Sequence, residues 1–234
     1  MAETLPPLPP EPPPGVPPGA PPPTSDPLPW EQPGYPFLEA LFETAKLVLT
    51  RPSEAFARMS LTVDLARPIL YAILFGWIGM VASQIYNLAL RGVLMNMLPL
   101  PGAWRGFAMP TAWSVATMVL APVFVLLGVF LWSAVVHLFL VLVGGANSGF
   151  GATVRVICYA STVQVLNVIP FCGGFLAMLW ALVLQILGLA VAHRTSQGKS
   201  ALAVLLPLAL CCACGLLLAV AFGAAIAAAI ANLG

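Results

Sequence analysis

The chain changes from polar and proline-rich residues near its start to long apolar runs that continue to its end. A bilayer core of about 30 Å takes roughly 20 helical residues, at about 1.5 Å for each residue. Sized against that length, the apolar runs predict five spans, at residues 68–90, 112–144, 151–169, 172–192 and 201–232. The pattern therefore predicts an all-α, polytopic transmembrane helix bundle over residues 68–232.

Two of these divisions depend on residues that favour a break or a turn. Residues 112–144 are too long for one upright helix and too short for two, so we expect one tilted helix that contains Pro122 and ends near Gly144. Residues 151–192 are long enough for two spans. The stretch 169–174 supplies the proline and the paired glycines of a tight turn between them.

Residues 1–36 are dominated by proline and hold little apolar surface to bury. This composition predicts a disordered or polyproline II arm. A semi-rigid spacer is the common role of such a segment, although its PxxP spacings also suit the groove of an SH3-like domain. An unknown soluble partner of the arm therefore remains an open alternative.

Residues 37–67 lie between the arm and the first span and mix apolar with charged residues. Apolar residues recur at helical intervals from Phe37 to Leu49, which predicts an amphipathic juxtamembrane helix on the cytoplasmic side. Pro52 is well placed to open a second short helix, because proline loses little in a first turn. Such helices lie along the bilayer surface or pack on the bundle, and both alternatives stay open.

Composition narrows the class of protein further. The chain is 60% hydrophobic and 7% charged, with a mean hydropathy of +0.98, whereas soluble domains keep roughly a quarter of their residues charged. A net charge of +1 without a cluster of Lys and Arg predicts no nucleic-acid partner. No Asp or Glu follows Asp64, so carboxylate bases, nucleophiles and hard-metal ligands are excluded from the spans.

Polar side chains inside the spans need a hydrogen-bonding neighbour or a wet cavity, because lipid tails offer no hydrogen bonds. The candidate intramembrane polar cluster consists of Ser83, Gln84, Asn87, His137, Ser161, Gln164 and Asn167. Hydrogen bonds between helices are their commoner role, and a path for a polar solute is the alternative. We expect a neutral, hydrogen-bonded His137 and an Arg155 that anchors its helix at lipid phosphate.

The sequence predicts no metal site and no catalytic site. We expect the five cysteines, which lie inside or at the ends of apolar runs, to be buried free thiols. Cys211, Cys212 and Cys214 lack the spacing and the companion ligands of a zinc site. No hydrolase, metalloprotease or phosphate-loop motif occurs, so we predict no catalytic residue and no cofactor. A small-residue stripe that favours close helix packing consists of Gly215, Ala219, Gly223 and Ala227.

Basic residues predict the orientation of the bundle, since cytoplasmic flanks retain Lys and Arg. With the N-terminus inside, the outer flanks hold Arg91 and Arg105, and all other basic residues fall on the inner flanks. This distribution favours a cytoplasmic N-terminus.

Several short motifs follow one another in order along residues 29–230. Pro29-Trp30-Glu31, Thr50-Arg51-Pro52 and Arg67-Pro68 precede the first span. The more specific positions are Arg155, Tyr159, Ile169-Pro170, Gly173, Trp180, Gly188, His193, Gly198-Lys199 and Pro207. In order and spacing these residues resemble the Yip-one domain family, in its bacterial branch, which is related to the Ypt/Rab-interacting (YIPF) membrane proteins of eukaryotes.

The resemblance implies five helical spans with a cytosolic N-terminus, and it suggests a bacterial inner membrane. The family usually has a proline a few residues after the tyrosine at position 159, whereas this chain has Ser161-Thr162-Val163 there. We therefore expect a less kinked third helix. Eukaryotic members resemble adaptors that engage Rab GTPases, a role that we do not transfer to this chain.

The leading functional hypothesis is a non-enzymatic membrane scaffold, organiser or adaptor. Its expected partners are the lipid bilayer, a second copy of the chain or other membrane proteins. A small-solute transporter or channel is the first alternative, and a membrane-bound enzyme is the second. Convergence of the polar residues of the first and third spans on a cavity at mid-membrane depth favours transport, whereas their pairing in a closed bundle favours a scaffold.

Overall fold

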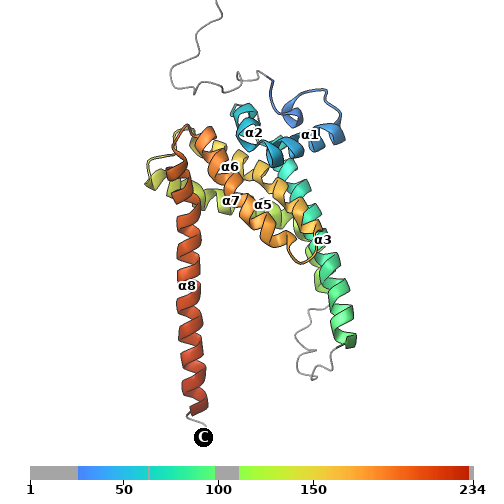
Figure 1. Ribbon diagram of the computed structural model, residues 1–234, viewed down its shortest axis with the longest axis vertical. Helices are drawn as coiled ribbons and strands as arrows, with labels where there is room; N and C mark the ends of the chain where they lie inside the picture. Colours follow the sequence, from blue (N-terminus) through green and yellow to red (C-terminus); the bar gives the residue numbers. More distant parts are fainter. Residues whose placement is uncertain (1–25, 63, 98–110, 232–234) are drawn as a thin grey trace, which may run out of the picture.

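The computed structural model describes residues 26–62, 64–97 and 111–231, and all regular structure in these residues is helical (Figure 1). The elements are η1 (Pro29–Glu31), α1 (Phe37–Thr50), α2 (Pro52–Arg58), α3 (Ala66–Met97), α5 (Thr111–Leu142), α6 (Gly149–Ala160), η2 (Ser161–Val168), α7 (Gly173–Ala192) and α8 (Gln197–Ala231). The elements named η are 3-10 helices. The all-α class predicted from the apolar runs is confirmed.

Within the described residues, five helical stretches are long and apolar enough to cross a membrane. They are Ala66–Leu90, Val115–Leu142, Gly149–Val168, Gly173–Ala192 and Gln197–Ala224. The predicted number of spans is confirmed.

Glycines stand where the chain turns sharply between spans. Gly144 has a φ of +65°, and the backbone N–H of Gly145 donates to the Leu140 carbonyl at 2.8 Å, which caps the end of α5. Between η2 and α7, a Cβ on Gly173 would lie 2.1 Å from the Leu166 carbonyl oxygen, so a larger residue does not fit without a backbone shift. Both predicted breaks occur at these places.

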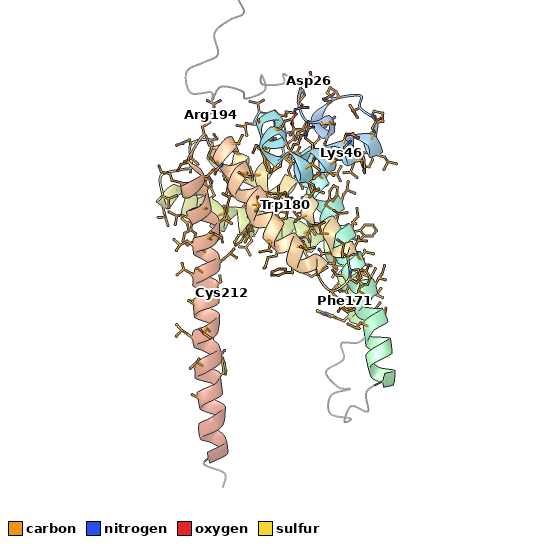
Figure 2. The ribbon with its side chains drawn as sticks, viewed as in Figure 1. Asp26, Lys46, Phe171, Trp180, Arg194 and Cys212 are labelled. Atoms are coloured by element: carbon orange, nitrogen blue, oxygen red, sulfur yellow. The ribbon has the colours of Figure 1, made fainter. Side chains whose placement is uncertain are left out.

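The two ends of the bundle differ in what lies there. α1 and α2 lie at the end where α3 begins, and α8 runs away from that end towards the opposite side (Figure 1). We call these ends the amino-terminal face and the carboxyl-terminal face. Figure 2 shows Asp26, Lys46 and Arg194 towards the amino-terminal face and Phe171 towards the carboxyl-terminal face. The charged residues labelled there gather at one end.

α1 and α2 are packed onto this amino-terminal face. The buried side of α1 consists of Ala40, Thr44, Ala45 and Val48. Its larger residues Phe37, Leu38 and Phe42 stay exposed, so the buried stripe differs from the one that the apolar pattern suggested. Phe56 of α2 lies against α7 at Gly188, where a Cβ would come within 2.9 Å of the phenylalanine ring. Of the two alternatives for this segment, packing on the bundle is therefore observed.

Part of the predicted disordered arm also packs on the bundle. Residues 26–36 belong to the described chain, and Leu28, Trp30 and Glu31 are buried there. The expectation of disorder as far as residue 36 does not hold for this part. Leu28 and Trp30 supply the apolar surface that is buried here, although most of the surrounding residues are proline. Residues 1–25 lie outside the described residues.

The third span changes its helical form halfway along. It is α-helical to Ala160, and a 3-10 helix continues from Ser161. Ser161 Oγ donates to the Cys158 carbonyl at 2.6 Å. Thr162 Oγ1 donates to the Tyr159 carbonyl, also at 2.6 Å. Both bonds reach three residues back, which is the spacing of a 3-10 turn. The sequence did not predict this change of helical form.

α8 packs on the bundle near its start and then leaves it. Ser200, Ala203 and Val204 are buried, whereas residues 209–224 are exposed throughout. Figure 2 shows Cys212 on the part of α8 that stands apart. The small-residue stripe lies on this part, with Gly215, Ala219 and Gly223 exposed and the side chain of Ala227 outside the described residues. The stripe therefore makes no packing face within the described bundle.

The course of α8 also corrects the expectation that all five thiols are buried. All five cysteines are free, but Cys158 alone is buried. The exposed ones are Cys172, Cys211, Cys212 and Cys214. Three of them lie on α8 beyond its last contact with the bundle, and the fourth precedes α7 in a turn.

Candidate functional site

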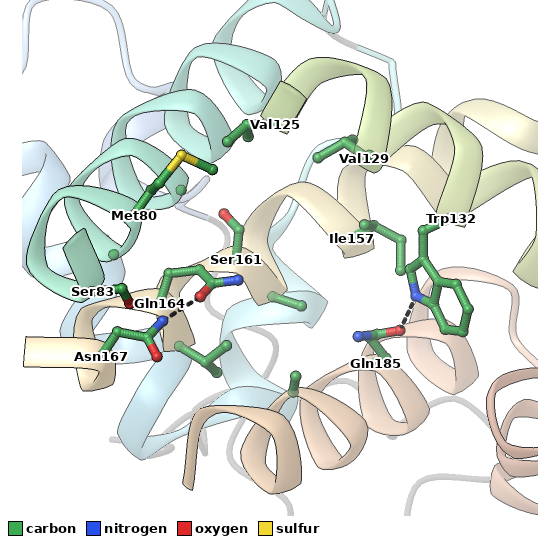
Figure 3. A pocket seen from close by; sticks show the side chains of 16 residues that line it. Met80, Ser83, Val125, Val129, Trp132, Ile157, Ser161, Gln164, Asn167 and Gln185 are labelled. Carbon is green, nitrogen blue, oxygen red and sulfur yellow. Dashed lines mark hydrogen bonds between the residues drawn. The ribbon is translucent and has the colours of Figure 1, made fainter. Parts of the chain in front are cut away.

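A cavity of about 500 Å³ lies among α3, α5, α6, η2 and α7 (Figure 3). Gly79, Gly128 and Ala181 are among its lining residues, and they lie near the centres of the first, second and fourth spans. The cavity therefore sits at mid-membrane depth. Its volume is in the range of small-molecule binding sites, which is roughly 300–1,000 Å³.

The wall of the cavity is polar but uncharged. Its polar residues are Ser83, Ser161, Gln164, Asn167 and Gln185. The other described lining residues are glycine, alanine or larger apolar residues, and none of the sixteen carries a charge. Such a wall suits an uncharged molecule that offers both hydrogen-bonding groups and apolar surface.

The carboxamides of the wall are held by hydrogen bonds that leave part of each amide free to meet a ligand. Asn167 Nδ2 donates to Gln164 Oε1 at 2.6 Å within η2. Trp132 Nε1 donates to Gln185 Oε1 at 2.7 Å, and this bond joins α5 to α7. Figure 3 shows the amide nitrogens of Gln164 and Gln185 turned away from these two bonds. The wall therefore offers fixed amide donors.

A second cavity of about 460 Å³ adjoins the first on the side of the carboxyl-terminal face. Ser83 and Asn167 line both cavities, whereas Asn87 and Phe171 line only the second. Phe171 is 93% exposed in the turn before α7. The two cavities therefore follow one another from mid-membrane depth towards the carboxyl-terminal face.

Residues 28–32 pack over the bundle at the opposite, amino-terminal face, and we call them the latch segment. The Trp30 indole N–H donates to the Arg67 carbonyl at 2.7 Å, and Arg67 Nη1 donates back to the Trp30 carbonyl at 3.1 Å. The Trp30 ring meets the Tyr71 ring edge-on, with centroids 5.7 Å apart. Polar and aromatic contacts thus tie the latch segment to the start of α3.

Glu31 joins the latch segment to the third span. Its Oε1 accepts a hydrogen bond from the Tyr159 hydroxyl at 2.7 Å, and its Oε2 accepts one from the Ser60 backbone N–H at 2.8 Å. Burial raises the pKa of the Glu31 carboxyl, and the two hydrogen bonds and the charges of Arg155 and Arg67 oppose that rise. A carboxylate from outside the spans therefore reaches a span, although no span has one of its own.

A second buried hydroxyl contact, between the first and third spans, lies beside the Glu31–Tyr159 contact. The Thr162 hydroxyl donates its hydrogen bond to the Tyr159 carbonyl. Thr162 Oγ1 therefore acts as the acceptor for the Tyr71 hydroxyl, 2.8 Å away. The Tyr71 and Tyr159 rings lie 5.1 Å apart. Ser161 and Val163, on either side of Thr162, both line the cavity. One 3-10 helix, η2, therefore supplies both a contact with Tyr71 of the first span and part of the cavity wall.

A histidine pair lies at the amino-terminal end of the bundle, apart from the cavity. The Ser148 N–H donates to His193 Nδ1 at 3.2 Å, so the proton of the neutral ring is on Nε2, which donates to Thr153 Oγ1 at 2.9 Å. Thr153 in turn donates to His137 Nδ1 at 2.8 Å. Burial, and to a lesser extent His137, lower the pKa of His193 to about 4. The pair joins α5, α6 and the end of α7.

The structure brings part of the predicted polar cluster together. The members that line the mid-membrane cavity are Ser83, Ser161, Gln164 and Asn167. Asn87 lines the adjoining cavity, and the predicted hydrogen bonding of His137 occurs in the histidine pair. Gln84 turns to α5 instead, where its Nε2 donates to Thr117 Oγ1 at 3.3 Å. Gln185, which the predicted cluster did not include, completes the wall.

Arg155 does not take the anchoring position predicted for it. It is 4% exposed within α6, and its charge acts on Glu31 rather than on lipid phosphate. The sequence analysis missed Glu31 as a partner of the spans. A signal was present in the adjacent Trp30 and Glu31, since an aromatic ring and a carboxylate find few partners within a proline-rich segment.

Residues 46–219 match the Yip1 domain, and the match runs from within α1 to within α8. The chain belongs to the Yip1 domain family. Together with the five apolar helices, this makes the protein a multi-pass integral membrane protein. The family resemblance predicted from the sequence is confirmed. Comparisons with curated proteins and with solved structures gave no match.

Several positions that carried the resemblance have a visible structural role in this Yip1 domain. Gly173 and Gly188 admit close neighbours, Tyr159 holds Glu31, and His193 belongs to the histidine pair, as described above. Lys199 Nζ donates to the Gly144 carbonyl at 2.9 Å and so joins the start of α8 to the end of α5. Pro170 lies in the turn before α7, Trp180 is partly buried against the core, and Pro207 is buried within α8. The latch segment precedes the matched residues.

Proposed function

We propose that this Yip1 domain protein binds a small uncharged polar molecule in its mid-membrane cavity and moves it across the membrane. The observation that carries the proposal is the convergence of Ser83, Ser161, Gln164 and Asn167 on one cavity at the centre of the bundle. Polar side chains at the centre of a membrane cost free energy unless they form hydrogen bonds. A cavity lined by several such side chains therefore suits a ligand that forms hydrogen bonds with them. This proposal ranks the transporter above the scaffold.

The chemistry of the wall restricts the solute. Gln164 and Gln185 supply amide donors, the Ser83 hydroxyl donates or accepts, and the Ser161 hydroxyl, which donates to the Cys158 carbonyl, can accept. An ion in this cavity would lose its hydration without meeting an opposite charge, which costs several kcal/mol. Polyols and small amides therefore fit the wall, and ions do not.

The basic residues support an orientation for this path. Those whose side chains the structure describes are Lys46, Arg51, Arg58, Arg67, Arg155, Arg194 and Lys199. All but the buried Arg155, which lies within α6, lie in or beside α1 and α2 or near the ends of spans at the amino-terminal face. Cytoplasmic flanks retain Lys and Arg, so the amino-terminal face is cytoplasmic in this proposal. In a bacterial inner membrane, the solute enters from the outer side through the adjoining cavity.

The proposed role is non-enzymatic. Among the described residues that line the cavity there is no His, Cys, Asp, Glu, Lys or Arg to act as a base or a nucleophile. The Ser161 hydroxyl donates a structural hydrogen bond to the Cys158 carbonyl. A carbonyl oxygen is not a base, so this bond does not activate Ser161 as a nucleophile. The wall therefore binds but does not activate a ligand.

Solute flux into proteoliposomes tests this proposal. Glycerol and urea serve as uncharged probes, and stopped-flow light scattering measures vesicle swelling against protein-free vesicles. We expect facilitated flux of at least one probe and its loss by about tenfold in Gln164→Leu, which removes a wall amide worth about 1.4 kcal/mol or more to the solute. The matched control is Gln84→Leu, an amide outside the wall, which should keep the flux. Equal flux in protein and protein-free vesicles contradicts the proposal.

The membrane organiser is the second candidate, because α1 carries exposed apolar residues at the amino-terminal face. Leu38 and Phe42 are 75% and 66% exposed, and they share one side of α1 since they stand four residues apart. An amphipathic helix of this kind suits the interface between lipid headgroups and tails. In this reading, the lipid-facing side of α1 bends or orders the cytoplasmic leaflet.

Vesicle size tests the second candidate. The double substitution Leu38→Ser and Phe42→Ser should abolish any change in vesicle diameter that the unaltered protein causes, as measured by electron cryomicroscopy of proteoliposomes. The control is Glu39→Ser on the same helix, which leaves the apolar side intact. Identical vesicle diameters with and without the protein contradict the organiser role.

A further inference from the structure

Glu31 stands out among the acidic residues that the structure describes, because it is buried, with 6% exposure. Each of its carboxyl oxygens accepts one hydrogen bond, from Tyr159 and from the Ser60 backbone. A buried carboxylate that keeps its partners is well held, whereas one that loses a partner is strongly destabilised. Moving the latch segment off the bundle therefore costs free energy, because Glu31 loses the partners of its buried carboxyl group.

The latch segment rests on both spans that supply most of the polar cavity wall. On the first span, Trp30 contacts Arg67 and Tyr71. On the third, Glu31 contacts Tyr159. Ser83 of the first span lies beside Gln164 and Asn167 of η2 in the third span, and all three residues line the cavity (Figure 3). A segment that joins these spans holds them together at the amino-terminal face.

The cavity begins a short way beyond these contacts. Gly76 lines the cavity and lies about 8 Å along α3 from Tyr71. On the third span, Ala160 lines the cavity directly after Tyr159. Tyr71 and Tyr159, which are both fully buried, therefore lie between the latch segment and the cavity.

We propose that residues 28–32 are a latch that closes the amino-terminal end of the mid-membrane cavity, and that breaking the Glu31–Tyr159 contact opens the cavity to that face. The inference rests on the proposed function, since it assigns a gate to the same solute site.

Thiol accessibility from each face of the membrane tests the latch. The probe is Ser161→Cys, on the cavity wall, in a full-length chain whose native cysteines are replaced by alanine. Sulfonatoethyl methanethiosulfonate, which does not cross lipid, is added to one face of oriented proteoliposomes at a time. With the latch intact, we expect modification from the carboxyl-terminal face and slow modification from the amino-terminal face.

The decisive comparison is the rate from the amino-terminal face after the contact is broken. Glu31→Ala should raise that rate about tenfold or more, because a lost hydrogen bond to a buried charged group changes a population by at least that factor. Tyr159→Phe should raise it in the same direction if Glu31→Ala does not fold. The matched control is Glu39→Ala, an exposed glutamate on α1, which should leave the rate unchanged.

The outcomes separate this inference from the proposed function. An unchanged rate from the amino-terminal face in folded Glu31→Ala and Tyr159→Phe overturns the latch. A fast rate from that face in the unaltered chain overturns it as well. Absence of modification from the carboxyl-terminal face overturns the open cavity itself, and with it the proposed solute path.

Discussion

The two halves of the bundle differ in the hydrogen bonds that their buried polar groups form. Near the amino-terminal face, Glu31, Tyr71 and Thr153 all bond to groups on other elements, and these bonds fix one helix to the next. In the cavity, Asn167 bonds to Gln164 within its own 3-10 helix and joins no helix to another. Polar groups at the amino-terminal face thus join helix to helix, whereas among the lining amides Gln185 alone does so, through Trp132, and those of η2 are left for a ligand to bind.

The largest effect should come from the turn that positions the cavity's 3-10 helix. Gly173→Ala forces a Cβ to within 2.1 Å of the Leu166 carbonyl oxygen, so backbone must move. We expect a loss of about 3 kcal/mol in the free energy of unfolding, measured by denaturant titration in detergent. The control is the next residue, since a Cβ on Gly174 meets the Asn167 side chain at an ordinary 3.4 Å. Equal losses for Gly174→Ala and Gly173→Ala would contradict the role of this close approach.

A smaller but clear loss is expected at the polar contact under the latch. Tyr159→Phe removes the hydroxyl that donates to Glu31 at 2.7 Å and leaves a buried carboxylate with one partner fewer. The free energy of unfolding should fall by about 2 kcal/mol. The control is Tyr35→Phe, at a half-buried tyrosine that follows the latch segment, and it should lower the free energy of unfolding by far less. A neutral Tyr159→Phe would mean that Glu31 is not held as described.

The histidine pair at the amino-terminal face should make the stability of the fold depend on pH. The pKa of His193 is about 4 in the folded protein and 6.5 as an unperturbed residue, so the unfolded chain binds the proton first as pH falls. The stability that neutral His193 provides is complete above pH 6.5 and is lost as pH falls towards 4. Glu31 acts with the opposite sign, because its pKa is raised.

A difference measurement isolates the histidine effect. Thermal unfolding of the unaltered chain and of His193→Gln should be compared between pH 7 and pH 4. We expect the unaltered chain to lose more stability over this interval than the variant, since the variant has no ring to protonate. Parallel pH profiles for the two chains would contradict a buried, neutral His193.

The smallest effect on stability should come from the cavity wall. Gln164→Leu replaces an amide that joins no second helix, so the free energy of unfolding should change by about 0.5 kcal/mol or less, or even rise. The same substitution should remove most of the solute flux. A residue whose substitution changes stability little but removes flux serves ligand binding and not the stability of the fold. A large loss of stability in Gln164→Leu would instead place this amide with the groups that hold the bundle.

Much of the fold follows from the sequence because it depends on local patterns. Five apolar runs of suitable length give the five spans, and Gly144 and the proline-glycine turn after η2 divide them as predicted. The 3-10 form of the third span was missed. Its cause is a pair of side-chain bonds from Ser161 and Thr162, which no hydrophobic period reveals.

The candidate site was only partly predictable, because it depends on contacts between distant segments. The first and third spans were correctly singled out by their amides, yet Gln84 points to α5 and misses the cavity while Gln185 completes it. Which side of a uniformly apolar helix faces its neighbours is not encoded in its period. The Glu31–Tyr159 contact joins positions 128 residues apart, and a carboxylate in a proline-rich segment does not indicate which span it contacts.

Hydrogen exchange along the third span tests the central claim most directly. Residues 152–160 of α6 are all buried, whereas most of η2 is only partly buried and Ser161, Val163, Gln164 and Asn167 line the cavity. In lipid nanodiscs, we predict that amides of residues 161–168 exchange much faster than those of residues 152–160, because water enters the cavity from one side. Equal protection along the whole span would contradict the account, since it would mean a dry, closed bundle from end to end.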